Sequence, residues 1–342
     1  MRISKRVVGL VVLILIINTV LSFVFHSPSY LRVALHEIQS DDVNYDIVFV
    51  GQSHGANAYN PYIIEEKTGM PAYNLCRGLM CNRDTAYLVK ESNYKNDVKY
   101  IIYDIDTSYW TSFENPNYVS DGYVFPHLNN PINKIEYFFR YTVNESFRYT
   151  LCRYVLYGSG GLKALPDNIK AKLKKEYYEY DLNAFFAERE QREYQGRGFF
   201  AGSVKDEGDY KPTKWNEEDV VVGALNGFKD IVEYCKEENI QLICISSPTP
   251  LKRLQAEGHD EINKYFSKLA KQSEIEFWDF NYIKPEYLVW DDDDFQDSDG
   301  HMFGTFANEY SEVLGDILNQ YFENESVTHY FDTVCMDDRM IE

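Results

Sequence analysis

A serine and a histidine stand side by side just after the first apolar run of the chain that could form a strand. The stretch reads DIVFVGQSHGAN, in which Ser53 and His54 follow a glycine by two and three positions. A second group lies near the other end, where Asp297 and Asp299 precede His301 by four and two residues. A serine hydroxyl becomes a nucleophile when an imidazole takes its proton and a carboxylate orients that imidazole. Together the two groups predict a triad of Ser53, His301 and Asp297.

Ser53 has two interpretations, and so does the histidine beside it. As a nucleophile, Ser53 is lifted out of the sheet by a sharp turn that Gly51 permits. Alone, it could instead cap a helix that begins near Asn57. His54 is too close in sequence to be the expected base, because neighbouring side chains diverge. We expect His54 to line the pocket or to orient its loop.

The two aspartates before His301 are not equivalent. In a turn that enters a helix, a residue three or four positions before the histidine lies on roughly the same side as its ring. Asp297 is therefore the expected partner of His301. Asp299 is the alternative partner, but we expect it to cap the last helix.

The acid-rich stretch also permits structural interpretations. Asp291–Asp294 is typical of a solvated acidic loop, and His301 could be a capping or core histidine. A calcium loop of the EF-hand type would need an oxygen ligand where Phe295 stands and a glutamate where Phe306 stands. Both requirements fail, so no metal is expected here.

Four short apolar runs predict the strands that must position these groups. Runs of this kind, without alternation, are typical of a parallel sheet buried on both faces. The runs are Asp46–Val50, Lys99–Asp104, Ile240–Ser246 and Ile275–Trp278. Helical spacing of apolar residues marks Thr85–Glu91, Glu217–Lys236 after a capping Asn216, Asp260–Lys271 and Met302–Phe322. The alternation predicts an α/β fold with a doubly wound parallel sheet, in which ligands bind at the carboxyl ends of the strands.

The chain is expected to divide into four regions. Residues 1–26 form the cytoplasmic start and a transmembrane anchor, and 27–44 a juxtamembrane linker. Residues 45–322 form the α/β domain, and 323–342 a loosely ordered acidic tail. The strand–helix alternation stops at about 108–216, where a Tyr-rich insertion is expected over the sheet edge, helical over Leu165–Tyr178. This insertion could be a lid, a substrate-recognition subdomain or only a structural cover.

The composition excludes some partners. A net charge of −20 repels nucleic acid and anionic lipid headgroups, since both require basic patches. We therefore expect no nucleic-acid binding. The 29 tyrosines suit sugar-binding faces, but also packed cores and membrane-interface belts. The six cysteines show no metal-binding spacing, although Cys76 and Cys81 are close enough in sequence to bridge in an oxidising compartment.

An apolar run opens the chain. Arg2, Lys5 and Arg6 precede Val7–Phe25, which is long enough to cross a bilayer core of about 30 Å. The leading positive charges hold the N-terminus in the cytoplasm. A cleaved signal peptide is the alternative, but its apolar region is usually shorter and no small-residue cleavage site follows. We expect an uncleaved single-pass anchor in the cell membrane, with the rest of the chain extracytoplasmic.

The two chemical groups and their setting resemble the SGNH (GDSL-like) hydrolase superfamily. VGQSH matches its first block in a Gly-x-Ser-His form, and the acid–histidine turn before the last helix matches its last block. The form resembles membrane-anchored bacterial members that modify cell-surface polymers, such as the teichoic-acid D-alanyl transfer protein and the alginate acetylation proteins. NPYIIEEKTGMPAYNL resembles the helix and second strand of that branch. The resemblance covers Asp46–Trp110 and Asn216–Phe322.

The resemblance implies an extracytoplasmic serine esterase or acyltransferase of the cell envelope, without a cofactor. Its substrates would be O-linked acyl groups, acetyl or D-alanyl, on an exopolysaccharide, another cell-surface glycan or teichoic acid. It also implies a membrane-bound O-acyltransferase as a partner. The oxyanion hole would use backbone N–H groups of Ser53 and Gly78.

The chain departs from the family pattern in two places. YDIDTSYW lacks the Gly-x-Asn-Asp block, so the asparagine donor of the oxyanion hole is missing. The residue three before His301 is Ser298, and one inserted residue such as Gly300 would make Asp297 the partner. The missing donor leaves a second hypothesis open: a catalytically silent protein of the same fold that binds or assembles a cell-surface polymer.

Overall fold

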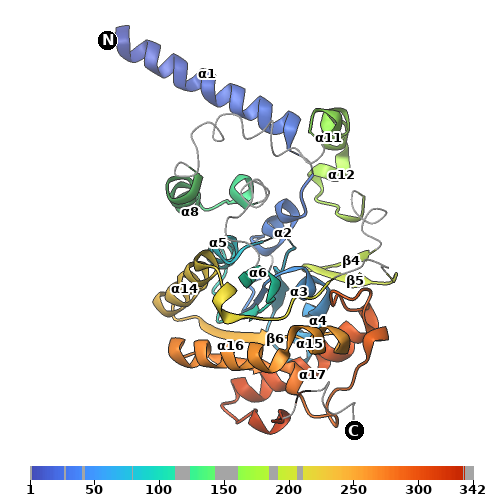
Figure 1. Ribbon diagram of the computed structural model, residues 1–342. Helices are drawn as coiled ribbons and strands as arrows, with labels where there is room; N and C mark the ends of the chain where they lie inside the picture. Colours follow the sequence, from blue (N-terminus) through green and yellow to red (C-terminus); the bar gives the residue numbers. More distant parts are fainter. Residues whose placement is uncertain are drawn as a thin grey trace.

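A five-stranded parallel sheet forms the centre of the protein (Figure 1). The computed structural model describes residues 2–26, 28–40, 43–78, 80–111, 124–142, 161–184, 192–205, 211–333 and 335. The strand order is β2-β1-β3-β6-β7. The strands are β1 (Ile47–Val50), β2 (Ala72–Asn74), β3 (Tyr100–Asp104), β6 (Gln241–Ser246) and β7 (Glu276–Asp279). The predicted α/β class and parallel sheet are confirmed, and all four apolar runs form strands. The three-residue β2 is too short to stand out as an apolar run.

Helices cover both faces of the sheet. Val48 and Val50 of β1 point to one face, and Ile47 and Phe49 to the other, which explains why the strand is apolar throughout. The first face packs against α2 (Tyr30–Ile38), α5 (Asn82–Asn93), α14 (Val222–Glu237) and α16 (His259–Ser273). The second packs against α3 (Ser53–Ala58), α4 (Pro61–Thr68) and α17 (Gly304–Phe322). A further helix, α15 (Leu251–Glu257), follows β6.

Many of the tyrosines belong to this core. Among the described residues, eight tyrosines are buried with at most 9% of their surface exposed, so packing accounts for much of the excess: Tyr45, Tyr59, Tyr73, Tyr87, Tyr103, Tyr137, Tyr282 and Tyr310. Cys76 and Cys81 are buried and free, so the bridge considered from the sequence is not formed.

Two regions differ from their predicted character. The expected linker 27–44 contains α2, whose Leu31, Ala34, Leu35 and Ile38 are part of the core. The described part of the tail is also attached to the domain rather than loose. Val327 is buried, and Phe331 pairs with Ile283 in an isolated bridge.

The region at about 108–216, where an insertion was expected, contains a set of short elements. Those within the described residues are α6 (Ser108–Thr111), η1 (Phe125–His127), α8 (Pro131–Tyr137), η2 (Phe138–Thr142), η3 (Gly161–Ala164), α11 (Leu165–Lys172), α12 (Lys175–Tyr178), β4 (Arg192–Gly196) and β5 (Phe199–Gly202). The expected helix Leu165–Tyr178 is divided between α11 and α12. Asn216 caps the short η4 (Glu217–Asp219) and not the long helix, which begins at Val222. The remaining short turns are η5 (Phe280–Tyr282), η6 (Asp292–Asp294) and η7 (Thr328–Tyr330).

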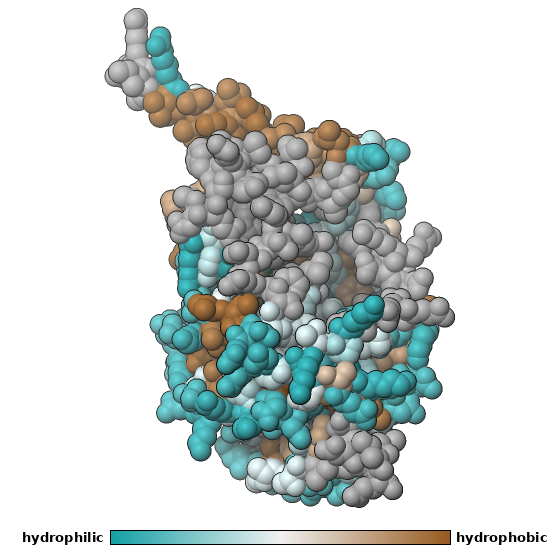
Figure 2. All heavy atoms as spheres, viewed as in Figure 1, coloured by the Kyte–Doolittle hydropathy of each residue, from teal (hydrophilic) through white to brown (hydrophobic). Residues whose placement is uncertain are grey.

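The N-terminal helix α1 (Arg2–Phe25) extends from the body of the protein (Figure 1). Its segment Lys5–Phe25 has a mean hydropathy of 2.8. By length and composition this segment can cross a membrane, and it is the one such helix among the described residues. Its apolar surface contrasts with the hydrophilic surface of the lower body (Figure 2).

Candidate functional site

Ser53 lies where the carboxyl end of β1 meets that of β3. A side chain at Gly51 would bring its Cβ within 2.8 Å of the Cβ of Asp104, so only glycine allows the two strand ends to approach this closely. Two residues later, Ser53 begins α3. The strand order reverses between β1 and β3, and such reversals are where open α/β sheets bind ligands.

The structure brings Ser53, His301 and Asp297 together. The Nε2 atom of His301 lies 2.9 Å from the Oγ atom of Ser53, and its Nδ1 atom lies 2.6 Å from Oδ2 of Asp297. The predicted partner is thus the one found, and each ring nitrogen has a different partner. Ser53 is half-buried, whereas His301 is only 9% exposed.

The turn before His301 explains the unusual spacing. The other carboxylate oxygen of Asp297 accepts hydrogen bonds from the backbone N–H groups of Gly300 and His301, at 2.9 and 3.1 Å. Gly300 has a φ of +114°, a conformation that favours glycine, and so accommodates the extra residue. Burial alone would raise the pKa of Asp297, but the hydrogen bonds from His301 and from the backbone hold it well below its usual range.

Gly78, which the resemblance assigns to the oxyanion hole, borders Ser53. A Cβ at this position would lie 3.2 Å from the Cβ of Ser53 and 3.7 Å from its Oγ. Gly78 is exposed, so the absence of a side chain leaves the space beside the hydroxyl open. This is the space that a carbonyl group would need for attack by Ser53.

His54 lines the cavity next to the triad, as predicted, but its electrostatic setting was not foreseen. Its Nδ1 atom lies 3.0 Å from Asp106, and its Nε2 atom lies 3.5 Å from Asp299. Burial would lower the pKa of His54, but the two carboxylates outweigh burial and raise it to about 10. The imidazole is therefore a cation at neutral pH.

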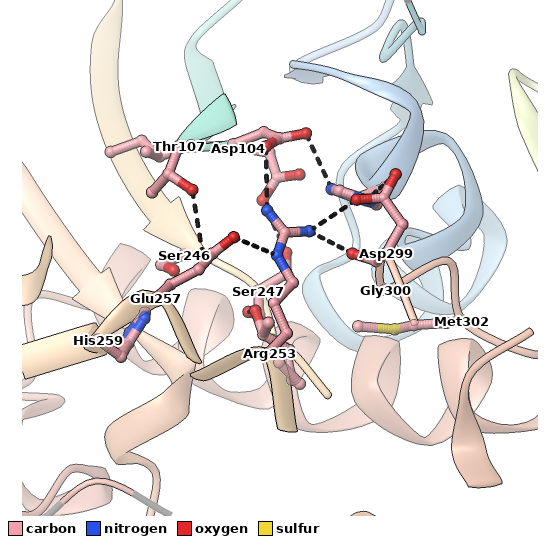
Figure 3. A pocket seen from close by; sticks show the side chains of 15 residues that line it. Asp104, Thr107, Ser246, Ser247, Arg253, Glu257, His259, Asp299, Gly300 and Met302 are labelled. Carbon is pink, nitrogen blue, oxygen red and sulfur yellow. Dashed lines mark hydrogen bonds and ion pairs between the residues drawn. The ribbon is translucent and has the colours of Figure 1, made fainter. Parts of the chain in front are cut away.

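Arg253 of α15 completes a network of buried charges behind the triad (Figure 3). It donates from Nε to Glu257 at 2.9 Å and from Nη1 to Oδ1 of Asp299 at 3.2 Å, and also bonds the backbone carbonyl of Asp299. Its Nη2 atom lies 3.5 Å from Asp106. The guanidinium and the His54 cation thus hold the loop that carries His301.

The role expected for Asp299 is corrected by this network. Asp299 was expected to cap the last helix, but α17 begins after Phe303 with no side-chain cap. Its carboxylate instead pairs with His54 and Arg253. These charges oppose the effect of burial and lower the pKa of Asp299.

A cavity of about 30 Å³ lies behind His54, lined by Asp104, Asp106, Ser247, Arg253 and Met302 among others (Figure 3). This volume has room for one or two water molecules. Ser53 is not part of its lining. The exposed Gly78 borders Ser53 on another side.

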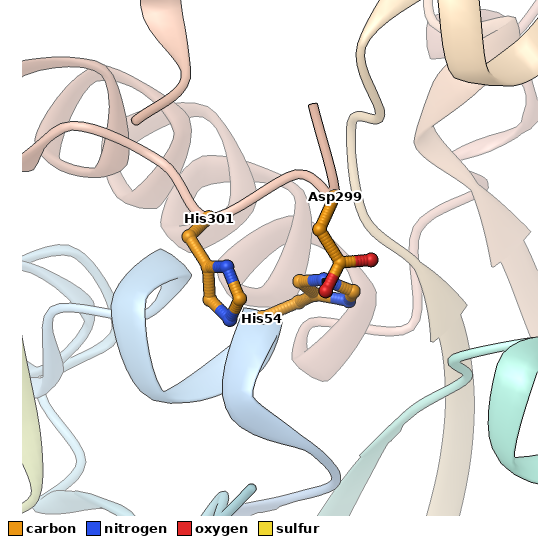
Figure 4. Close-up of side chains that lie close together, drawn as sticks. All are labelled: His54, Asp299 and His301. Carbon is orange, nitrogen blue, oxygen red and sulfur yellow. Dashed lines mark ion pairs between the residues drawn. The ribbon is translucent and has the colours of Figure 1, made fainter. Parts of the chain in front are cut away.

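His54, Asp299 and His301 each place one possible metal-ligating atom within 4.8 Å of the others (Figure 4). However, the nitrogen atoms of His301 face Ser53 and Asp297, and those of His54 face two carboxylates. An ion would have to displace these partners. The donor set fits a network of protonated and ionised side chains better than a metal centre.

No family model, no curated protein and no solved structure matches this chain.

The residues missed from the sequence lie at the ends of the neighbouring strands. Asp104 is the last residue of β3, and Asp106 follows it by two positions. Ser247 follows β6 and donates to Asp104 at 2.7 Å. The polar YDIDTS and SSPTP that end two buried strands were the available signal. Arg253 gave no such signal, because its partners are distant in sequence.

Proposed function

We propose that the protein is a serine esterase or acyltransferase. The observation that carries this proposal is the hydrogen-bonded series Ser53–His301–Asp297, at 2.9 and 2.6 Å, at the carboxyl end of the sheet. The same set of groups performs acyl transfer on several unrelated folds. A further His–Asp pair, His259 with Asp279 at 2.8 Å, lies outside this series.

The reaction has two halves. His301 accepts the proton of Ser53 at Nε2 while Oγ attacks the ester carbonyl, and Asp297 stabilises the resulting imidazolium. The backbone N–H groups of Ser53 and Gly78 stabilise the oxyanion. His301 then gives its proton to the leaving alcohol, which leaves an acyl group on Ser53. In the second half, His301 deprotonates water or a sugar hydroxyl, which takes the acyl group and frees Ser53.

The substrate class rests on the resemblance to membrane-anchored SGNH proteins. Helix α1 supports a single-pass anchor, and the strand order is the one of flavodoxin-like sheets, which such a domain would use. We therefore assign the protein to the outer face of the cell membrane. Its substrates would be O-linked acetyl or D-alanyl groups on a cell-surface polysaccharide or teichoic acid, supplied with a membrane-bound O-acyltransferase as partner.

A catalytically silent polymer-binding protein is the second candidate. The feature that favours it is Asp106, which lies near the expected place of the third-block asparagine and binds His54 rather than offering an amide donor. Loss of one oxyanion donor typically costs a factor of about 10²–10³ in turnover.

Labelling with a fluorophosphonate separates the two candidates. The full-length protein in detergent should become labelled at Ser53, and Ser53→Ala should abolish the labelling. Ser298 is an exposed serine in the turn before His301, so Ser298→Ala is the matched control and should label like the wild type. Absence of labelling in a protein with an unchanged melting transition would favour the silent binder.

A further inference from the structure

Helix α8 turns its apolar residues outward. Ile132, Ile135 and Phe139, spaced along one helical face through α8 and η2, are 73%, 59% and 63% exposed. The opposite face is buried: Asn133 donates to Glu91, and Tyr137 donates to Asp84 at 2.7 Å while its ring packs in the core. This is the reverse of a helix that packs its apolar side on a soluble core.

A second exposed group surrounds α11. Leu162 and Leu173 are 69% and 72% exposed. The segment 161–175 contains one acidic residue, Asp167, and five lysines: Lys163, Lys170, Lys172, Lys174 and Lys175. These residues carry a net charge of +4 (five lysines less one aspartate) in a chain of net charge −20, and Lys170 pairs with Asp167 and Lys175 with Glu179.

This basic segment is attached to the end of the apolar helix α1. Lys172 donates from Nζ to the carbonyl of Phe23 at 2.5 Å, and Asn168 donates to the carbonyl of Phe25 at 3.1 Å. Figure 1 shows α8 and α11 toward the end of the molecule from which α1 extends. His26 follows directly after α1 and lies near both α8 and α11. Burial, the charge of Lys172 in α11 and the charge of Lys134 in α8 together lower the pKa of His26 to about 4.

We propose that these elements form a platform that rests on the surface of an anionic phospholipid bilayer, beside the inserted α1. The platform consists of Ile132, Ile135, Phe139, Leu162 and Leu173, with Lys163, Lys170, Lys174 and Lys175 around them. Apolar side chains enter the headgroup region while the lysines contact lipid phosphates. The net charge of the chain predicts repulsion from such headgroups, but the platform reverses that sign locally.

The inference rests on the membrane anchorage assigned under the proposed function, and on nothing about catalysis. A lipid surface is the occupant favoured by the attachment to α1 and by the lysines. An apolar face of a membrane protein is the competing occupant, which pure lipid vesicles do not contain.

Tryptophan quenching by brominated lipids tests the platform. The full-length protein is reconstituted in phosphatidylcholine vesicles containing phosphatidylglycerol, with or without bromine on the upper acyl chain. Phe139→Trp reports on the platform, Val12→Trp on α1, and the exposed Val289→Trp on the sheet domain. The four native tryptophans give the same background in every variant. We expect the added fluorescence of Phe139→Trp to fall about twofold, since interfacial helices sit roughly 5–10 Å deep.

Each outcome has a distinct meaning. Val289→Trp should be unquenched and Val12→Trp strongly quenched. If Phe139→Trp behaves like Val289→Trp while Val12→Trp is quenched, the platform does not contact lipid and the proposal is wrong. If Val12→Trp is also unquenched, the anchor itself is wrong, and the platform falls with it. Neither result bears on the labelling of Ser53.

A quadruple variant tests the role of the platform lysines. Lys163, Lys170, Lys174 and Lys175 are changed together to Gln in the Phe139→Trp background, and Lys172 is kept because it bonds α1. Quenching should decrease in vesicles that contain phosphatidylglycerol and stay the same in phosphatidylcholine alone. Equal quenching of both proteins in the anionic vesicles would contradict the role given to the lysines.

Discussion

Two histidines flank the nucleophile in opposite electrostatic settings. His301 has one carboxylate on Nδ1 and the hydroxyl of Ser53 on Nε2. His54, the neighbour of Ser53 in sequence, lies between the carboxylates of Asp106 and Asp299. The rings are close, with centroids 4.7 Å apart. Of the two rings, that of His301 has a nitrogen within hydrogen-bonding distance of the Ser53 hydroxyl.

In the proposed mechanism, the partners of each imidazole, and not its proximity to Ser53 in the chain, decide which one acts as the base. A histidine held by two carboxylates keeps its proton through neutral pH. A histidine held by one carboxylate and one hydroxyl can gain and lose it within a reaction. His54 is therefore a positioning residue in our account, and His301 the catalytic one.

Replacing each histidine gives the largest expected contrast. His301→Gln should lower the rate of acyl transfer by about 10⁶-fold, as removal of a triad histidine can. His54→Gln should lower it by no more than about 10²-fold, the effect of a small displacement of a reacting group. The measurement is kcat/KM for a p-nitrophenyl ester. A larger loss for His54→Gln would exchange the two roles.

Replacing Asp297 and Asp299 should give the same kind of contrast in activity, with a smaller difference. Asp297→Asn should reduce acyl transfer by about 10⁴-fold while the protein stays folded, because an amide selects the wrong tautomer of His301. Asp299→Asn should cost less than about 10²-fold, since it disturbs only the loop. Melting transitions serve as the control for folding. Near-wild-type activity of Asp297→Asn would show that His301 and Ser53 act as a dyad.

The charge on His54 makes stability depend on alkaline pH. Its pKa rises from 6.5 to about 10 on folding, so its contribution is complete below pH 6.5 and is lost as pH approaches 10. The free energy of unfolding should therefore fall by up to about 1.4 kcal/mol per pH unit between pH 7 and 9. Urea titrations at three pH values measure this slope. His54→Gln should have a smaller slope, and identical slopes would show that His54 is not charged.

The smallest effect on activity is expected from the third histidine–aspartate pair. His259 and Asp279 are both buried and bonded at 2.8 Å, with Asn263 and Asn281 also on the carboxylate. His259→Gln should destabilise the protein, by about 1–3 kcal/mol for a buried group left without its partner. Its kcat/KM should stay close to that of the wild type. A large loss of activity without a change in stability would place this pair in the mechanism.

The triad was predictable because each of its members has a local signature. Ser53 follows a buried strand, and Asp297 and His301 share a turn before an amphipathic helix. The network around His54 was not predictable from the sequence. It joins the ends of β1 and β3 to helix α15 and to the turn before His301. No local pattern links Asp106 to His54, or Arg253 to Asp299, across such distances in the chain.

The same limit applies to the elements. The strands that are buried on both faces were evident as apolar runs, but β2 has only three residues. Helix α2 was missed because its proximity to the apolar start suggested a linker, whereas its buried residues pack beneath the sheet. The sequence pattern of a short segment does not show which face of the sheet the segment packs against.

Only four residues separate the end of α1 at Phe25 from the start of α2 at Tyr30. Fully stretched, such a tether reaches no more than about 18 Å. Because α2 is part of the core, a protein anchored through α1 would keep Ser53 within a limited distance of the bilayer. Under the proposed function, it would meet a polymer by lateral diffusion, and the encounter would depend on the local concentration of acyl groups near the membrane. Distal segments of a long surface polymer would remain out of range until they grow past, or bend back toward, the membrane.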